Sequence, residues 1–101
     1  MIKVNIKKEN DIITNVKVEG HAGYGLKGTD IVCASVSSIV ITSLNAIIRI
    51  DEDSIDYKQD EGFIEVSIKK HDKYIDILID NMISLLKELE KDYKKNIEIY
   101  E

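Results

Sequence analysis

The chain has 101 residues, which suits one domain over 1–101, and 44% of them are hydrophobic, enough to build a core. Charged residues make up 33% and are spread along the chain with a net charge of −5, which excludes a charged disordered tail and the basic face of a duplex nucleic-acid binder. One cysteine excludes an internal disulfide. We also expect no signal peptide and no stretch of the ~20 apolar residues that span a bilayer. The expected location is therefore the cytoplasm.

The N-terminal residues predict a pair of strands. Ile2, Val4 and Ile6 alternate with polar residues, and this period of two is typical of a strand with one buried face. Residues 9–11 predict a hairpin turn, and a second strand follows it. The inward and outward positions of that second strand are ambiguous around residues 14–15.

Residues 20–30, GHAGYGLKGTD, interrupt this pattern. They hold four of the five glycines in the protein, a density that neither a strand nor a helix tolerates. The segment therefore predicts a mobile loop, whose glycines are Gly20, Gly23, Gly25 and Gly28.

Residues 31–50 form a long apolar run that predicts a helix, because a strand of twenty residues would be unusual. Thr29 or Asp30 supplies a suitable N-cap. Apolar side chains occur almost all the way round this helix, so more than one side must be covered. One side can lie on a sheet, and the other needs a second helix or a partner subunit, from which we expect a homodimer.

The second half repeats the strand pattern and adds a second helix. Alternation predicts strands at 55–58, 63–68 and 97–99, and apolar residues spaced by three and four predict an amphipathic helix over 72–93. The element order is β-β-α-β-β-α-β. We therefore predict an α+β domain with two layers, in which two helices cover one face of a mixed β-sheet.

The residues that suggest chemistry are His21 and Cys33, twelve positions apart. A loop from a strand to a helix can fold back and bring its two ends together. Free N–H groups in the first helical turn favour a negative charge, and therefore the reactive thiolate of Cys33. His21 is then the expected base, whereas His71 lies in a charged surface segment. The alternative for Cys33 is a small buried residue of an apolar helix, as most free cysteines are.

Three further features surround this pair. Asp30 orients the imidazole or, equally well, caps the helix. Ser37 lies one helical turn after Cys33 and either positions the thiol and the substrate or packs as a small residue. The loop glycines let backbone N–H groups approach a substrate, and N–H groups at the helix start are expected to hold an oxyanion.

Other kinds of site fit less well. The glycine loop lacks the phosphate-binding pattern G-x-x-x-x-G-K-[ST], since Thr29 follows Gly28, and Asp30 would repel a phosphate. Structural zinc usually takes four ligands, and the chain offers one cysteine and two histidines. We therefore expect no metal and no cofactor.

The segment GHAGYGLKGTDIVCASVSSIV, followed by NAII at 45–48, resembles the bacterial ribosomal-processing cysteine protease Prp family. The family pattern G-H-A, a loop, G-x-D-[IL]-V-C-A and V-[ST] is matched at 20–22, 28–34 and 36–37. The late DYKKN segment at 92–96 and the order of elements also match, so the resemblance covers essentially the whole chain. Departures are Ser35, where the family often has Ala or Gly, and the glycines at 23 and 25 of the loop, which imply weaker binding of free peptide.

This resemblance implies a homodimeric cysteine endopeptidase without a cofactor. Its substrate would be the precursor of a large-subunit ribosomal protein, the one numbered twenty-seven, whose short N-terminal extension is removed after an aromatic-rich motif. By motif position Cys33 is the nucleophile and His21 the base, while Asp30 and Ser37 match positions of less settled role. The glycine loop would close over the substrate. The competing hypothesis is a non-enzymatic ribosome-associated or assembly factor of the same fold, with its thiol buried and unused.

Overall fold

The computed structural model describes residues 1–26 and 28–101, so Lys27 of the predicted loop lies outside the described residues. Its elements follow the predicted order. They are β1 (Ile2–Glu9), β2 (Ile12–Glu19), α1 (Ile31–Ile50), β3 (Ile55–Asp60), β4 (Phe63–Ile68), α2 (Lys73–Asp92) and β5 (Ile97–Tyr100). The predicted α+β class is confirmed, and every predicted strand and helix is present.

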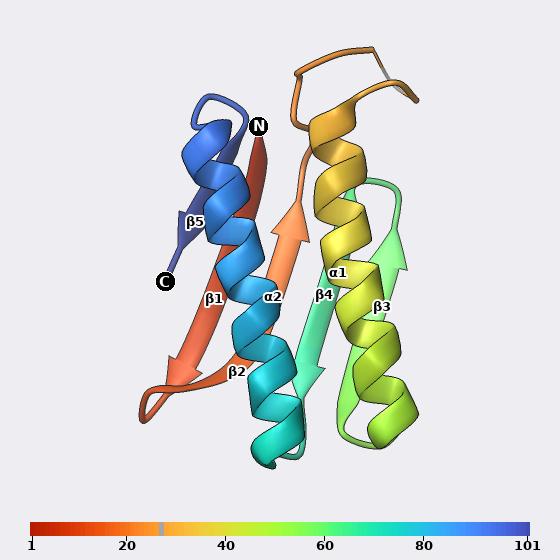
Figure 1. The fold of residues 1–101 in the computed structure, drawn as a ribbon, viewed down its shortest axis with the longest axis vertical. Helices are drawn as coiled ribbons and strands as arrows, with labels where there is room; N and C mark the ends of the chain where they lie inside the picture. The colour runs from red at the N-terminus through yellow and green to blue at the C-terminus, as the bar shows by residue number, and fades with distance from the viewer. Residues whose placement is uncertain (27) are drawn as a thin grey trace.

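The five strands form one mixed sheet in the order β3-β4-β2-β1-β5. β1 and β5 are parallel, whereas the pairs β1–β2, β2–β4 and β3–β4 are antiparallel. Figure 1 shows that the N-terminus, the end of β2 and the turn from α2 to β5 all lie at one end of the sheet. The loop that leaves β2 therefore begins close to the N-terminus and to the turn before β5.

The strand phase that is ambiguous in the sequence has a structural cause. Lys7 pairs with Asn15, but Lys8 pairs with Ile13, so Thr14 is an extra residue in β2. Such a bulge reverses the inward and outward positions on its two sides. After the bulge, Val16 faces the core in the regular alternation.

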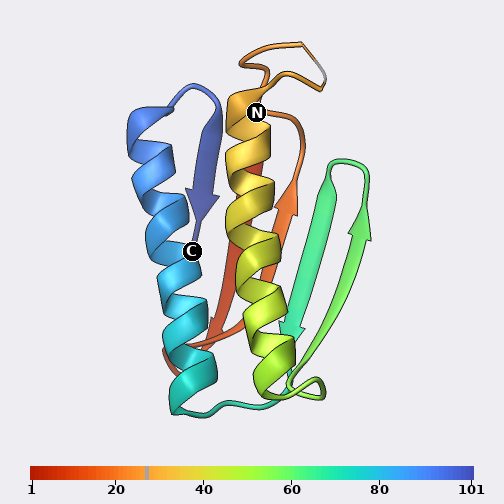
Figure 2. The same cartoon turned by 45° about the vertical axis from the view of Figure 1, so that its right-hand side comes forward.

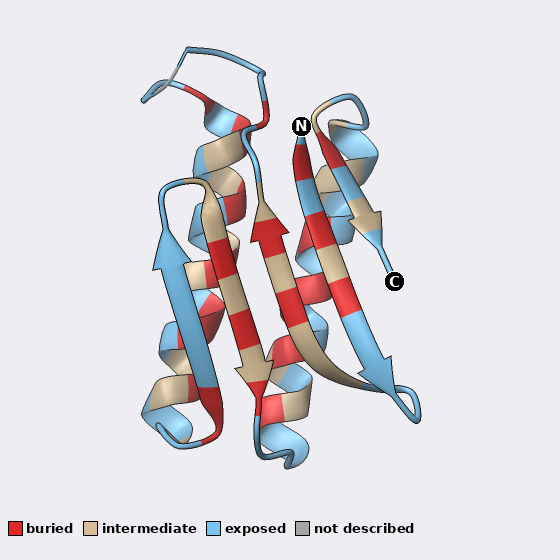
Figure 3. Cartoon of the chain, turned by 180° about the vertical axis from the view of Figure 1, so that it is seen from behind, coloured by how far each residue is buried: buried red, intermediate tan, exposed pale blue. Residues whose placement is uncertain are grey.

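Both helices lie on the same face of the sheet, as Figure 2 shows from the side. Seen from behind, β1, β2 and β4 carry alternating bands of buried residues, because every second side chain points toward the helices, whereas β3 is exposed after Ile55 (Figure 3). The helices contribute buried aliphatic residues to this layer, among them Val32, Val36, Val40, Leu44, Ile47, Ile75, Ile79, Met82 and Leu86. The core therefore lies between one sheet face and two helices.

Helix α1 corrects one expectation from the sequence. It is long and apolar enough to span a membrane by length and composition, although we expected no such stretch. One face of the helix is part of the core, and this packing accounts for its buried aliphatic residues. Its exposed positions carry small or polar residues such as Ala34, Ser38 and Asn45, together with Ile31 at its start and Ile50 at its end.

Candidate active site

The site begins where the chain leaves β2 at Gly20. This residue has φ +100°, a conformation that glycine adopts without strain. A Cβ atom at Gly20 would also clash with the carbonyl oxygen of Met1. The Gly20 N–H donates a 2.9 Å hydrogen bond to the carbonyl oxygen of Gly62, in the turn between β3 and β4. A glycine is therefore required here, and it directs the next residue, His21, toward the β3–β4 hairpin.

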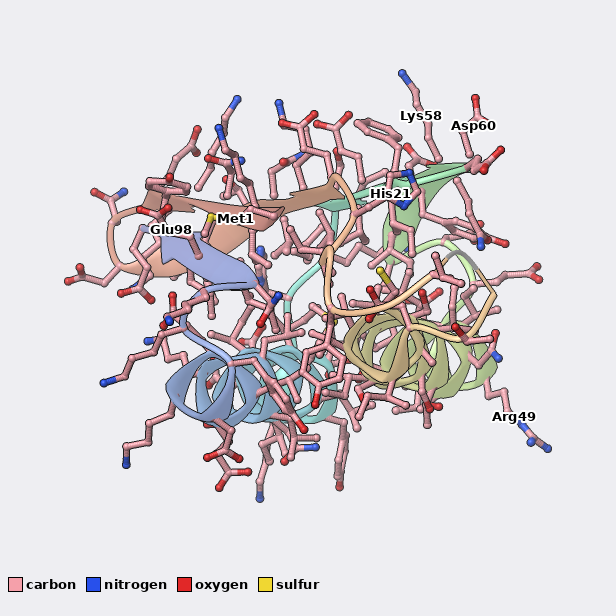
Figure 4. All side chains as sticks on the ribbon, turned by 90° about the horizontal axis from the view of Figure 1, so that it is seen from above. Met1, His21, Arg49, Lys58, Asp60 and Glu98 are labelled. Carbon is pink, nitrogen blue, oxygen red and sulfur yellow. The ribbon has the colours of Figure 1, made fainter. Side chains whose placement is uncertain are left out.

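His21 is exposed and lies against that hairpin. A Cβ atom built on Gly62 would lie 3.0 Å from Nε2 of His21, so the imidazole fits closely over a residue without a side chain. Figure 4, which views this end from above, shows His21 beside the hairpin and near Asp60. The absence of a side chain at Gly62 therefore gives the ring its space.

Cys33 lies in the first turn of α1 and is half-buried. Its Sγ accepts a 3.2 Å hydrogen bond from the backbone N–H of Ala22, the residue after His21. The loop thus folds back onto the helix start, as expected from its length. Within 1–26 and 28–101, no hydrogen bond joins the His21 imidazole to Cys33, although both residues line the same cavities.

Two cavities meet at this pair. One, of about 200 Å³, lies between the start of α1 and the sheet and has apolar walls that include Val18, Phe63 and Ile64. The other, of about 400 Å³, lies under the glycine loop. His21, Cys33 and Ser37 line both cavities, so an extended chain could cross the thiol from one cavity to the other.

A larger cavity, of about 920 Å³, lies between α2 and β5. Its lining contains lysines, glutamates and isoleucines but neither cysteine nor histidine. Size alone therefore does not locate the chemistry, and we assign the candidate site to the two smaller cavities at Cys33.

Asp30 is the N-cap of α1 and also holds the loop. Its Oδ1 accepts hydrogen bonds from the N–H groups of Val32 (2.9 Å) and Cys33 (3.1 Å). Its Oδ2 accepts from Tyr24 (2.9 Å) and Gly25 (3.1 Å).

These bonds set the charge of the carboxyl group. Burial alone would raise the pKa of Asp30, but the four backbone N–H groups outweigh it and bring the pKa below the ordinary value of 3.8. Asp30 is therefore ionised at neutral pH. The sequence allowed two roles for Asp30, capping the helix or orienting the imidazole, and the structure shows the capping role. Both carboxylate oxygens of Asp30 bind backbone N–H groups.

The same bonds change one prediction about the helix start. The N–H groups of Val32 and Cys33 bind Asp30 Oδ1, and that of Ala34 donates a 3.0 Å bond to the Asp30 carbonyl oxygen. Three of the helix-start amides that we expected to hold an oxyanion therefore already have an acceptor in Asp30.

Two anchors of the loop come from the end of α2 and were not found from the sequence. The side-chain Nδ2 of Asn96 donates a 3.0 Å hydrogen bond to the carbonyl oxygen of Ala22. The ring of Tyr93 meets that of Tyr24 edge to face, with centroids 5.4 Å apart. Both anchors belong to the DYKKN segment, which the sequence analysis noted only as part of the resemblance.

The remaining candidates are also placed. His71 is joined to Asp76 at 2.8 Å, next to the start of α2, and does not line either cavity at Cys33. Among the described residues there is no group of three or more His, Cys, Asp or Glu side chains that could hold a metal ion. The two cavities at Cys33 bring together the thiol, the imidazole and the Ser37 side chain.

A family model described as cysteine protease Prp matches residues 1–98. This chain belongs to the Prp family of cysteine proteases. The ribosomal processing cysteine protease Prp of Staphylococcus aureus strain Mu50 is 31% identical over 103 residues, which cover 98% of this chain and 97% of the relative. The Prp protein of Bacillus subtilis strain 168 is 30% identical over 107 residues, covering 98% and 96%.

Solved structures of Prp proteins agree with this assignment. A crystal structure of the essential S. aureus Prp with a covalently linked product peptide has a TM-score of 0.90 at 31% identity, covering 99% of this chain and 98% of that one. The same protease with a substrate peptide gives 0.86 at 30% identity, with both chains covered completely. SMU.848 of Streptococcus mutans, at 23% identity and a TM-score of 0.81, shares the fold. The chain is therefore a cysteine protease of the ribosomal-processing family.

Proposed function

We propose that this chain is an endopeptidase that removes the short N-terminal extension of a large-subunit ribosomal protein, the one numbered twenty-seven, with Cys33 as nucleophile and His21 as base. One observation carries the proposal: the only cysteine of the sequence lies at the start of α1, at the junction of two cavities that His21 of the glycine loop also lines. Membership of a cysteine protease family supports it, because such a protease needs a thiol and Cys33 is the one this chain has. That membership also disfavours the non-enzymatic alternative.

The proposed reaction has two halves. The Cys33 thiolate attacks the scissile carbonyl carbon, and the C=O electron pair moves onto the oxygen. When this pair returns, the C–N bond breaks and His21 gives its proton to the leaving amine. A water molecule, deprotonated by His21, then attacks the thioester and frees the thiol.

The resting geometry is compatible with this mechanism. Catalytic hydrogen bonds are often long or absent before substrate binds, and they tighten in the complex. His21 is exposed on a loop, and in this proposal its ring turns toward Cys33 and takes the thiol proton when substrate binds. The closing movement of the glycine loop remains part of this proposal.

The two neighbouring residues receive separate roles. Asp30 holds the loop against the helix start through its four backbone hydrogen bonds, and thereby orients the His21–Ala22 backbone. Ser37 lines both cavities and its side chain is exposed, so its hydroxyl is placed to position the peptide.

The cavity between α1 and the sheet supports the proposed peptide preference. Its walls include Ile2, Val18, Val36, Phe63 and Ile64, which are suited to an apolar or aromatic side chain. An aromatic-rich motif before the cleaved bond would place such a side chain there.

We also propose a cytoplasmic homodimer that pairs through the outer side of the two helices. A groove there is lined by Ile31, Ala34, Ser35, Ser38, Ile39, Leu85, Glu88, Leu89 and Asp92. Ile31 is 53% exposed and Leu85 38% exposed, so the groove presents apolar surface to solvent. A second copy would cover the side of α1 that the sheet leaves open.

The experiment that tests the substrate uses two peptides. One spans the junction between the extension and the mature N-terminus of that ribosomal protein, and the other has the same composition in scrambled order. We expect wild-type protein to cleave the junction peptide at one bond and to leave the scrambled peptide intact, as read by mass spectrometry. Equal cleavage of both peptides, or of neither, would overturn the proposed specificity.

A further inference from the structure

The peptide backbone at Ala22 is held from two sides. Its N–H donates to Cys33 Sγ at 3.2 Å, and its carbonyl oxygen accepts from Asn96 Nδ2 at 3.0 Å. Ala22 is only 3% exposed, so the residue that makes both bonds is closely packed in the core. Cys33 is thus connected, through Ala22, to the side chain of Asn96, which lies 74 positions after Ala22 in the sequence.

Asn96 is itself firmly placed. Its backbone N–H donates to the carbonyl oxygen of Tyr93 at 2.9 Å, and its own carbonyl oxygen accepts from Ile2 N–H at 2.8 Å. The residue therefore sits at the junction between the end of α2 and the parallel pair β1–β5. The contact between the Tyr93 and Tyr24 rings joins the same turn to the loop a second time.

Cysteine attack on a carbonyl needs N–H donors that stabilise the developing oxyanion. The N–H groups of Val32, Cys33 and Ala34 are already bound to Asp30. The N–H of Ala22 is different, because its acceptor is the sulfur atom that loses negative charge during attack.

We propose that the Ala22 N–H is an oxyanion donor and that Asn96 is the positioning residue that holds it there; this inference rests on the proposed function. The sulfur lone pair forms the S–C bond, the C=O electron pair moves to the oxygen, and the negative charge shifts by two bonds from Sγ. A donor fixed beside Sγ lies within reach of that oxygen. When the C=O bond re-forms, the amine leaves with the proton from His21.

The most direct test replaces the Ala22 N–H by an oxygen atom. Cys33 is the only cysteine, so a synthetic 1–32 thioester can be ligated to a 33–101 fragment at the natural residue. The synthetic part carries lactic acid in place of Ala22, which changes the amide to an ester. The all-amide ligated protein is the matched control.

Two rates separate an oxyanion donor from a group that acts on the thiolate alone. Peptide cleavage forms an oxyanion, whereas alkylation by iodoacetamide does not. Both rates are measured at a pH above which neither rate increases further. We expect kcat for cleavage to fall by about 100-fold or more, the loss typical of one oxyanion donor, with KM and the alkylation rate changed less than about 3-fold. A change of less than about 3-fold in kcat, or equal losses of cleavage and alkylation, would overturn the inference.

Asn96→Asp tests the positioning role. This change removes the donor Nδ2 and places a carboxylate oxygen against the Ala22 carbonyl. We expect kcat to fall by about 10-fold at unchanged KM, since a misplaced group costs roughly one to two orders of magnitude. Asn81→Asp, the same change at an exposed position of α2, should keep wild-type kcat, and Asn96→Gln, which retains the amide donor, should recover part of the loss.

Several outcomes overturn the inference and one concerns the proposed function instead. Wild-type kcat in Asn96→Asp, or the same loss in Asn81→Asp, contradicts the role of Asn96. If Asn96→Asp does not fold, as judged by circular dichroism, the ester protein decides. A 100-fold loss in Ser37→Ala with an active ester protein would assign the oxyanion to the Ser37 hydroxyl. If the all-amide control cleaves no junction peptide, the proposed function has failed instead.

Discussion

At the scale of single residues, the site depends on groups that do two things at once. The Asp30 carboxylate caps α1 with one oxygen and holds the loop with the other. Ala22 joins Cys33 to Asn96 through its N–H and its carbonyl group. Because each group has two partners, one substitution should affect both stability and turnover, and matched control variants are needed to separate the two effects.

Asp30→Ala should make stability less dependent on pH. The pKa of Asp30 is below 3.8 in the folded protein, so the charged form is stabilised by folding. This stabilisation is complete above the unfolded-state pKa, near 3.8, and is lost as the pH falls through the lower folded-state pKa. Urea unfolding should therefore show a difference between wild type and Asp30→Ala that is largest at neutral pH and shrinks below about pH 4.

Asp72→Ala is the control for that variant. Asp72 caps α2 through the N–H groups of Tyr74 and Ile75, both at 2.9 Å, and lies outside the candidate site. Both variants should lose stability through their caps, but only Asp30→Ala should also lower kcat under conditions where the protein stays folded. Equal kcat in the two variants would remove Asp30 from the site.

Gly20→Ala should destabilise the fold strongly. An alanine would adopt φ +100° and its Cβ would clash with the Met1 carbonyl oxygen. The expected loss in the free energy of unfolding exceeds about 2 kcal/mol, since the left-handed conformation alone costs about 1–2 kcal/mol. Gly23→Ala has a similar φ of +70° with nothing within 4 Å, so it should lose only the backbone part. Similar losses from thermal melts of both variants would contradict this account.

At the scale of the elements, much of the fold could be predicted because each strand and helix carries its own period. The alternation in β1 and the three-and-four spacing in α2 are visible without any tertiary contact. The bulge at Thr14 was seen only as an ambiguous phase, since a bulge is defined by the partner strand. The bond between Asn96 and Ala22 had no local signal, because it joins two segments that meet only after the sheet forms.

Leu85 and Leu86 test the orientation of α2. Leu86 is fully buried against the core, whereas Leu85 is 38% exposed on the outer side. Leu86→Ala should lower the free energy of unfolding by about 3 kcal/mol through the cavity it leaves. Leu85→Ala should cost less than about 1 kcal/mol in the monomer. Urea titrations of the two variants would contradict the described packing if the order were reversed.

At the scale of the whole molecule, the site is built where the N-terminus meets the end of β2 and the turn before β5, whereas the C-terminal Glu101 pairs with Lys8 near the other end of β1. The Met1 carbonyl oxygen packs against Gly20, and the Ile2 N–H donates to the Asn96 carbonyl oxygen beside the loop that carries His21 (Figure 1). The Cys–His pair could be proposed from the sequence because its two residues lie in one short segment. The structure around the pair could not be predicted, because it is assembled from the first residues, the β3–β4 hairpin and the turn before β5.

The homodimer proposal predicts a particle of twice the chain mass of 11.5 kDa in light scattering at micromolar concentration. Leu85→Lys should shift it to the monomer, because a charge would then lie in the apolar groove between the helices. Ile77→Lys, at a position of α2 that is 54% exposed and outside that groove, should remain dimeric. A monomeric wild type would count against the dimer.

The central claim is that the Cys33 thiol attacks the peptide bond. The measurement that tests it is the rate of junction-peptide cleavage by wild type and by Cys33→Ala, with circular dichroism to show that both are folded. We predict single-bond cleavage by wild type and a rate at least about 1,000-fold lower for Cys33→Ala, because the covalent step is lost. Cleavage by folded Cys33→Ala at a rate within about 10-fold of wild type would contradict the account.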